Sequence, residues 1–298
     1  MAMKAQENVL PIEGSSRVIA RQDRRIGTIL AEQGKLGLRD IERVLELQQR
    51  QGLRFGEAAL RVGLITKEDL QSALAAQYDF PQLLPGTRGI STEVVVAYEP
   101  FHPRAEELRA LRAELVIGWS KAEVRHRVLA IVSPGHREGR SYLAANLAVL
   151  FSQLGERTLL IDADLRAPRQ HRIFDVPDTF GLSAVLSGRA DRNAVMPIPN
   201  FGRLSVLPAG ARPPNPQELL SRHVLGDLLQ EVRTEFDVIL FDTPPAKLYA
   251  DARIVAFRAG TAVVLVRKDR TRLADTTGVM RELTNSGARI VGTVLNKF

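Results

Sequence analysis

Apolar and polar residues alternate along the chain in two different patterns. Between about residues 24 and 80, apolar residues recur at the three- and four-residue spacing of amphipathic helices. From residue 127 onward, short continuous apolar runs alternate with helical segments such as residues 141–154. Such runs predict a parallel β-sheet covered by helices on both faces, and these sheets bind ligands at the carboxyl ends of their strands. The predicted strands are residues 128–133, 158–164, 204–208, 237–242, 261–266 and 289–295.

The helical N-terminal part contains an internal repeat. Residues 25–34 (RIGTILAEQG) match residues 54–63 (RFGEAALRVG), and the similarity continues to Gln48 and Gln77. Every matched pair is 29 residues apart, so two units of 24 residues flank a five-residue spacer, residues 49–53. This regularity indicates one structural motif used twice.

Each repeat unit is predicted to form two short helices. The first helix ends at Gly34 or Gly63, because glycine readily adopts the left-handed backbone that closes a helix. The second begins after Leu38 or Thr66, and Thr66 with Asp69 three residues later is typical of a capping box.

The tandem pattern over residues 24–80 resembles the MshEN domain, the N-terminal domain of type II secretion and pilus ATPases. The resemblance implies that this part binds cyclic di-GMP, with the arginines on the bases and phosphates, the glycines allowing close backbone approach, and the leucine and glutamine positions completing the contacts. The alternative is a docking module that has kept the same core without the ligand. The implied binding residues are Arg25, Ile26, Gly27, Ile41, Leu45, Gln48, Arg54, Phe55, Gly56, Leu70, Leu74 and Gln77.

The composition of the chain indicates the cellular compartment and the classes of partner to be expected. The 298 residues include no cysteine, which excludes disulfides and cysteine-ligated zinc and suits a reducing cytosol. No apolar run approaches the roughly 18 residues of a membrane span, and residues 1–21 are predicted to be a disordered leader without signal-peptide features. The net charge of +7 is interspersed with acidic residues and no nucleic-acid motif is present. We therefore expect a cytoplasmic protein that binds no nucleic acid and reaches the inner face of a membrane through a partner.

Residues 81–103 are rich in Pro, Gly, Ser and Thr, which predicts a linker. A helix is expected over residues 104–117. Glu106, Arg109 and Arg112 lie on one face of it, because residues three apart in a helix are neighbours.

The first strand of the predicted sheet leads into a degenerate phosphate-binding loop, residues 133–141 (SPGHREGRS). Gly135, Gly139 and Ser141 match a Walker A motif, whose backbone amides cradle phosphates and whose hydroxyl contacts Mg²⁺. Arg140 occupies the usual lysine position, and Pro134 that of the first glycine.

Two further strands end in aspartates. Asp162 and Asp164 follow one strand, and Asp242 ends another in the sequence DTPP, in the manner of a Walker B motif. Carboxylates at the strand ends beside Ser141 suit Mg²⁺, which prefers oxygen ligands. The sequence therefore predicts a P-loop nucleotide-binding fold, and its Asp162 and Asp242 motifs resemble those of the ParA/MinD-like ATPases.

The second part of the chain resembles the bacterial tyrosine kinases of polysaccharide export, and most closely their chain-length-determinant kinase EpsG group. The matching stretches lie within residues 104–298 and include residues 141–155, 159–172, 207–220 and 237–245. The resemblance implies ATP and Mg²⁺ as cofactors, a membrane chain-length determinant as partner, and self-association through Glu106, Arg109 and Arg112. It implies catalytic roles for Asp162, Asp164 and Arg140, Mg²⁺ binding by Ser141, Asp164 and Asp242, and ATP binding by Gly135, Arg137, Glu138, Gly139, Arg140, Ser141, Tyr142 and Asn296.

The expected organisation is thus a leader (1–21), an MshEN-like domain (22–80), a linker (81–103) and an ATP-binding domain (104–298). The function implied is control of exopolysaccharide chain length or export, with cyclic di-GMP as regulator.

Two departures from the kinase pattern leave alternatives open. Arg140 replaces lysine, and Arg137 stands where related kinases have glycine. Those kinases also phosphorylate tyrosines in a C-terminal tail, whereas no tyrosine follows Tyr249 here. The alternatives are a kinase acting on another protein, a catalytically weak or inactive scaffold, and a ParA/MinD-like positioning ATPase.

Overall fold

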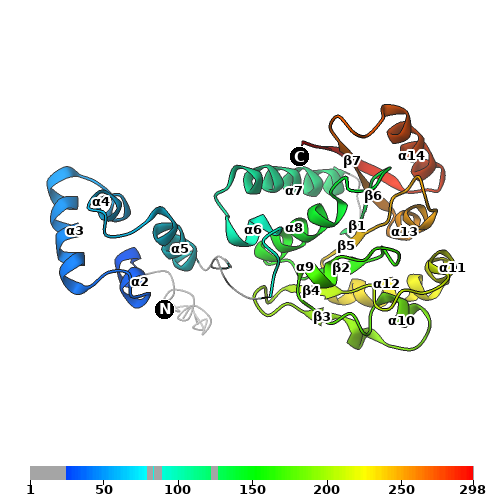
Figure 1. Ribbon diagram of the computed structural model, residues 1–298, viewed down its shortest axis with the longest axis horizontal. Helices are drawn as coiled ribbons and strands as arrows, with labels where there is room; N and C mark the ends of the chain where they lie inside the picture. The colour runs from blue at the N-terminus through cyan, green and yellow to red at the C-terminus, as the bar shows by residue number, and fades with distance from the viewer. Residues whose placement is uncertain (1–24, 79–82, 84–88, 122–126, 298) are drawn as a thin grey trace, which may run out of the picture. The chain divides into compact units, whose positions relative to one another are not determined.

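The computed structural model describes residues 25–78, 83, 89–121 and 127–297, and the chain divides into two units, Met1–Gln82 and Leu83–Phe298 (Figure 1). The expected leader, residues 1–21, lies outside the described residues. In the described part of the chain, no helix combines the length and the apolar character needed to cross a membrane.

The first unit consists of four helices, two from each repeat. They are α2 (Ile26–Glu32), α3 (Leu38–Gln51), α4 (Phe55–Arg61) and α5 (Lys67–Gln77). Helix α2 packs on α5 and α3 on α4, so the first helix of each repeat contacts the second helix of the other. The apolar positions of the helices meet in one small core of Ile29, Leu30, Leu36, Val44, Ala58, Ala59, Ile65 and Ala73.

The helix ends of this unit confirm the predicted caps. Gly34 and Gly63 have φ angles of 69° and 75°, in the left-handed region. Thr66 Oγ1 accepts a hydrogen bond from Asp69 N at 3.1 Å, and Thr66 N donates to Asp69 Oδ2 at 2.9 Å. This reciprocal pair is the predicted capping box.

The second unit is built on a sheet with the strand order β3-β4-β2-β5-β1-β6-β7. The sequence predicted every strand but β3, which is only two residues long and pairs antiparallel with β4 at the edge; all the other pairings are parallel. The centre of the sheet is parallel, as predicted. The antiparallel β3 at the edge makes the whole sheet mixed, which was not predicted. The strands are β1 (Arg127–Val132), β2 (Thr158–Asp162), β3 (Met196–Pro197), β4 (Leu204–Leu207), β5 (Val238–Asp242), β6 (Thr261–Arg267) and β7 (Arg289–Asn296).

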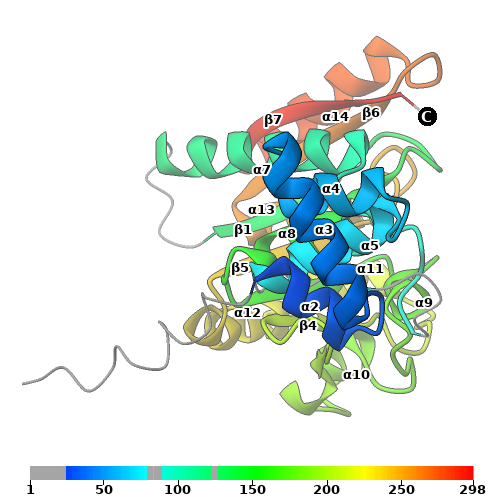
Figure 2. The same ribbon diagram turned by 90° about the vertical axis from the view of Figure 1, so that its left-hand side faces the viewer.

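Helices cover both faces of the sheet, because alternate strand residues point to opposite sides. Leu129 and Ile131 of β1 face a core with α6, α7, α8 and α9, whereas Val128 and Ala130 face a core with α10 to α14 (Figure 1). Strand β7 lies between α7 and α14 (Figure 2). The helices are α6 (Val95–Tyr98), α7 (Pro103–Lys121), α8 (Arg140–Gln153), α9 (Gln170–Ile173), α10 (Leu182–Leu186), α11 (Pro216–Ser221), α12 (Val224–Glu235), α13 (Asp251–Ala259) and α14 (Leu273–Asn285).

The prediction of a linker over residues 81–103 was wrong for its described second half. Val94 and Val96 are fully buried in the core of the second unit. Val96 N donates to Asn146 Oδ1 of α8 at 3.3 Å, and Asn146 Nδ2 donates to the Glu93 carbonyl at 3.0 Å. Composition alone indicated a loop, but this segment is fixed by burial and by hydrogen bonds to a residue far along the chain.

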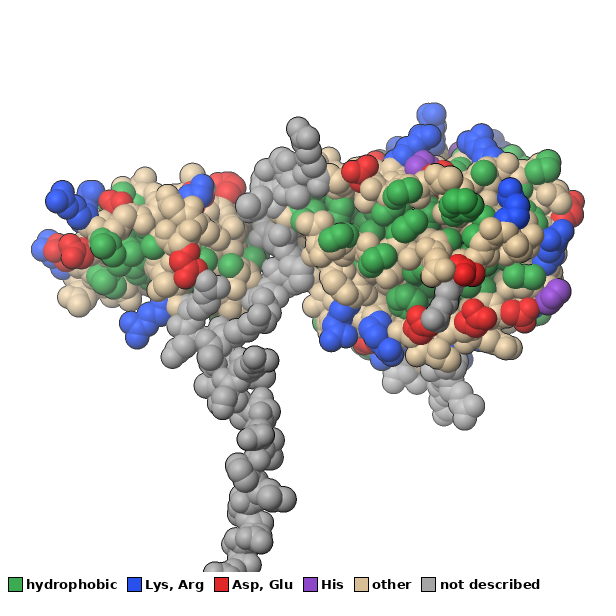
Figure 3. Space-filling model, turned by 90° about the horizontal axis from the view of Figure 1, so that it is seen from below, with side chains coloured by type: hydrophobic (Ala, Val, Ile, Leu, Met, Phe, Trp, Pro, Cys, Tyr) green, Lys and Arg blue, Asp and Glu red, His purple; other side chains and the backbone are tan. Residues whose placement is uncertain are grey.

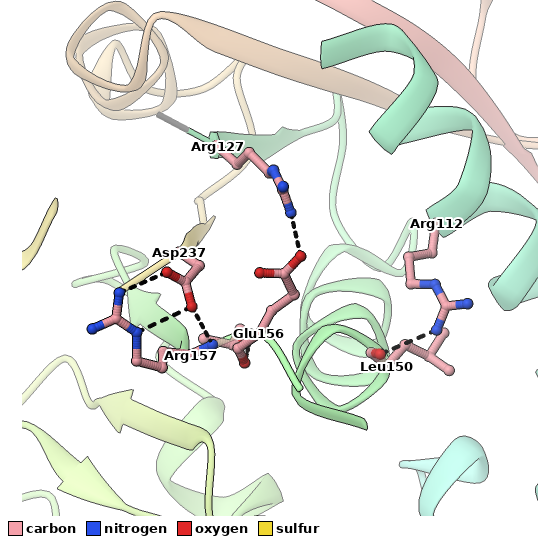
Figure 4. A network of polar contacts seen from close by, with 7 residues as sticks. Arg112, Arg127, Leu150, Glu156, Arg157 and Asp237 are labelled. Carbon is pink, nitrogen blue, oxygen red and sulfur yellow. Dashed lines mark hydrogen bonds and ion pairs between the residues drawn. The ribbon is translucent and has the colours of Figure 1, made fainter. Parts of the chain in front are cut away.

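Ion pairs join the segments at the amino ends of the central strands (Figure 4). Arg157 binds Asp237 with both ends of its guanidinium, at 3.1 Å to Oδ2 and 2.7 Å to Oδ1, and Arg127 pairs with Glu156 at 2.5 Å. The Arg157 guanidinium and backbone amide lower the pKa of Asp237 to about 2. These pairs lie at the amino ends of the strands, whereas the predicted site lies at their carboxyl ends.

On the face of the second unit presented in Figure 3, hydrophobic side chains gather in the middle and acidic side chains follow the lower margin.

Candidate active site

The predicted acidic residues meet at the carboxyl ends of neighbouring strands. Strand β5 lies between β1 and β2, and Asp162 and Asp242 are direct partners across β2 and β5. The phosphate-loop sequence leaves the adjacent strand β1 and enters α8. The strand register therefore brings the phosphate loop, Asp162 and Asp242 together at the carboxyl ends of the strands, as the sequence predicted.

Asp162 is fully buried and holds the loop that follows β2. Its Oδ2 accepts hydrogen bonds from the backbone amides of Arg169 at 3.0 Å and Gln170 at 2.9 Å, and its Oδ1 accepts from Asp164 N at 3.2 Å. Burial raises the pKa of Asp162, and the neighbouring Asp242 carboxylate raises it further. Both carboxylate oxygens are thus engaged by backbone.

Asp164 is the more accessible carboxylate of this loop, with 7% of the residue exposed against none of Asp162. Its Oδ1 accepts from the amides of Arg166 at 3.2 Å and Ala167 at 2.9 Å. This local turn fixes the orientation of the Asp164 carboxylate.

The contacts of Asp242 bear most directly on whether these residues suit a cation. The side chain of Ser141 and the Gln170 amide both hydrogen-bond to it, whereas its Oδ1 is buried and has no partner within the described part of the chain. Burial raises the pKa of Asp242. A hydroxyl, carboxylates and an orphaned carboxylate oxygen form the oxygen-rich set that Mg²⁺ takes, so the residues fit that ion.

The phosphate loop has the expected shape with one strained residue. Gly139 has φ 104° and precedes α8, whose first amides face a phosphate in loops of this kind. Arg137 has φ 57°, a left-handed conformation that costs a side-chain-bearing residue free energy. Arg267 donates to the Arg137 carbonyl at 3.0 Å and helps to hold it there.

Arg140 is buried beneath the loop. Its Nε donates to the Thr243 carbonyl at 2.7 Å, and one terminal nitrogen donates to the Gly135 carbonyl at 2.6 Å and to the Ser133 hydroxyl. Burial lowers the pKa of Arg140, while Asp242 and Asp164 oppose that shift. The guanidinium therefore links the loop to the end of β5 and supplies the positive charge beside the carboxylates.

The Glu138 side chain forms hydrogen bonds within the phosphate loop and to a neighbouring segment. Its Oε2 accepts from Gly135 N at 2.7 Å, and Thr271 donates to Oε1. Asn296 at the end of β7 donates to the Glu138 carbonyl at 2.9 Å. Asn296 and Tyr142 both line an adjoining cavity of about 460 Å³, so these two predicted ATP-binding residues lie together beside the phosphate loop.

The cyclic di-GMP residues implied for the first unit occupy equivalent places in the two repeats. Arg25 and Arg54 are exposed and precede α2 and α4. A β-carbon at Gly27 would lie 2.9 Å from the Phe55 ring, and one at Gly56 would lie 2.6 Å from a methyl group of Leu70. Packing within the unit is therefore sufficient reason for both glycines.

Glu106, Arg109 and Arg112, which share one face of α7, do not make the same kind of contact. Arg109 pairs with Glu106, whose side chain is 64% exposed. Arg112 instead donates to the Leu150 carbonyl in the last turn of α8 at 3.1 Å (Figure 4). Arg112 thus caps a helix of its own unit.

Two residues of the site were not assigned a role from the sequence. Gln170 is fully buried between Asp242 and α8. Arg166 pairs with the buried Asp251 at 2.8 Å, and its guanidinium stacks 3.9 Å from the centre of the Tyr249 ring. Both residues lie within the matching stretch 159–172, but only the tertiary structure shows what their side chains contact.

Comparison with known proteins agrees with this geometry, although no family model matches the chain. The chain is 33% identical to tyrosine-protein kinase YwqD of Bacillus subtilis over 203 residues, 68% of this chain and 85% of YwqD. The kinase domain of the Escherichia coli tyrosine kinase ETK superposes with a TM-score of 0.66 at 28% identity, over 74% of this chain and 85% of that domain. The septum site-determining protein MinD of Pyrococcus horikoshii, solved with Mg-ADP, superposes with a TM-score of 0.51 at 26% identity, over 57% and 70%. The strand-end aspartates, the phosphate loop and these similarities together establish that the chain belongs to the bacterial tyrosine kinase family.

Proposed function

We propose that the second unit binds ATP with Mg²⁺ and transfers the γ-phosphoryl group to a tyrosine of a partner protein. The observation that carries the proposal is the meeting of Ser141, Asp164 and Asp242 beside the phosphate loop, where one Asp242 oxygen has no hydrogen-bond partner among the described residues. Mg²⁺, when bound, neutralises phosphate charge, and positioning supplies most of the remaining catalysis.

The roles of the two loop aspartates follow from their contacts. Both oxygens of Asp162 are held by backbone amides, so this residue shapes the loop. Asp164 is the less deeply buried of the two carboxylates and accepts the proton as the tyrosine oxygen attacks the γ-phosphorus and ADP leaves. Arg140 keeps positive charge at the loop.

A phosphotyrosine assay tests this proposal. The full chain is incubated with ATP, Mg²⁺ and a tyrosine-containing copolymer, and an Asp164→Ala variant is compared with Asp237→Asn at the opposite edge of the sheet. We expect the first variant to lose phosphorylation and the second to keep it. Equal phosphorylation by all three proteins would remove Asp164 from the reaction.

The proposed biological role is control of exopolysaccharide chain length or export, as in the EpsG group. The proposed partner is a membrane chain-length determinant. Self-association through Glu106, Arg109 and Arg112 on α7 is part of this proposal, supported by the exposure of Glu106. Glu106→Lys should reduce the assembly mass measured by light scattering, whereas Glu231→Lys on the exposed side of α12 should not.

Cyclic di-GMP is proposed as the regulator, supported by the equivalent exposed arginines at the two repeat units. Calorimetry should detect binding that is weakened by Arg25→Ala and by Arg54→Ala. Arg50→Ala is the matched control, because Arg50 is 78% exposed in the same unit and pairs only with Glu46 among the described ion pairs. Absence of heat with the unaltered chain would leave this unit a docking module.

A scaffold without phosphoryl transfer is the second candidate. It is favoured by the strained Arg137 and by the Glu138 carboxylate, which occupies the Gly135 amide that a phosphate would use. Nucleotide binding without any phosphotyrosine product would support it.

A further inference from the structure

Gln170 connects the parts of the site that have to act together. Its side-chain Nε2 donates to Asp242 Oδ2 at 2.8 Å and to the Ser141 carbonyl at 3.1 Å. Its backbone amide donates to Asp162 Oδ2 at 2.9 Å. One residue at the start of α9 therefore contacts the ends of β2 and β5 and the first turn of α8.

The orientation of the Gln170 amide is fixed by its partners. Both groups that Nε2 contacts are oxygen acceptors, so the NH₂ end must face them and Oε1 must occupy the other end. Oε1 is buried and has no hydrogen-bond partner among the described residues, and the same is true of Asp242 Oδ1. Burying an acceptor without a donor is costly, so each of these two oxygens is expected to meet a donor or a cation that the described residues do not supply.

We propose that Gln170 is a positioning residue of the Mg²⁺ site, an inference that rests on the proposed function. Its NH₂ group binds Oδ2 of Asp242 and thereby turns Oδ1 toward the ion site. Its Oε1 accepts a hydrogen bond from the hydration shell of the ion. Because the same amide holds the Ser141 carbonyl, it also fixes the distance between the hydroxyl-bearing turn of α8 and the aspartate.

A purely structural role for Gln170 makes a different prediction. Gln170 is fully buried, so replacing it affects stability in either case. Only a positioning role makes the loss depend on Mg²⁺. Outer partners of metal sites typically change metal affinity 10- to 100-fold, and the proposed effect is of that size.

The test measures how strongly Mg²⁺ promotes binding of a fluorescent ADP analogue to the full chain. Gln170→Met keeps the side-chain length and removes both polar ends. We expect its apparent Mg²⁺ affinity to fall by about tenfold or more, with nucleotide affinity in EDTA unchanged. Gln153→Met is the matched control: Gln153 donates to the Val96 carbonyl at 3.4 Å and ends the same helix that Ser141 begins. Its Mg²⁺ affinity should equal that of the unaltered chain.

Unchanged Mg²⁺ affinity in a folded Gln170→Met variant would overturn the inference, as would an equal loss of nucleotide affinity with and without Mg²⁺. If that variant does not fold, Gln170→Asn keeps the amide but withdraws it by one methylene, and it must show the same selective loss. Nucleotide binding by the unaltered chain that ignores Mg²⁺ would contradict the proposed function itself, and the inference with it.

Discussion

Replacing Arg140 by methionine should destabilise the second unit strongly. The substitution keeps the apolar stem but removes the donors to the Thr243 and Gly135 carbonyls, and it removes the positive charge beside Asp164 and Asp242. Hydrogen bonds from a charged group contribute about 1.5–3 kcal/mol each. Relief from burying the guanidinium offsets part of this, so a net loss of about 3 kcal/mol is expected.

That loss corresponds to a fall of roughly 6–12 °C in the melting temperature of a unit of this size. Thermal unfolding followed by circular dichroism, without nucleotide, measures it. Arg157→Met is the control, because Arg157 forms a solvent-exposed ion pair at the amino ends of the strands, and its loss should lower the melting temperature far less. An Arg140→Met variant as stable as the unaltered chain would refute the interpretation of Arg140 as the counter-charge of the site.

Three other predictions concern separate parts of the second unit. Because the pKa of Asp237 is about 2, below its ordinary 3.8, its pairing with Arg157 stabilises the fold above about pH 4 and is lost as the pH falls toward 2. The difference in unfolding free energy between the unaltered chain and Asp237→Asn should shrink over that interval, and a difference independent of pH would contradict the pairing. Gly181→Ala should lower the melting temperature by several degrees, since a β-carbon there would lie 2.2 Å from the Pro208 carbonyl oxygen; an unchanged melting temperature would show that the backbone yields freely. Arg112→Met should cost about 1 kcal/mol in urea unfolding through loss of the cap on α8, and no cost would exclude the cap.

Sequence patterns predicted the centre of the fold well, because buried parallel strands must be continuously apolar. They missed β3, which is too short to show a period, and they misread residues 89–103, whose order depends on Asn146. The capping box at Thr66 was predictable because it depends on neighbours three residues away. Local chemistry is visible in the sequence, whereas contacts across the chain are not.

The candidate site divides in the same way. The positions of Ser141, Asp162 and Asp242 follow from strand ends and a loop motif, and the positive φ of Arg137 follows from its place in that motif. The burial of Arg140 and the role of Gln170 depend on the packing of α8 and α9 against β5, which no spacing encodes.

We propose that Ser141, Asp164 and Asp242 make the second unit a Mg²⁺-dependent ATP site. Calorimetric titration of the full chain with ATP, in Mg²⁺ and then in EDTA, is the decisive test. We expect saturable binding in Mg²⁺ that is at least tenfold weaker in EDTA, the size of effect given for groups that support a metal site. Absence of binding in Mg²⁺, or equal binding in both solutions, would contradict the account.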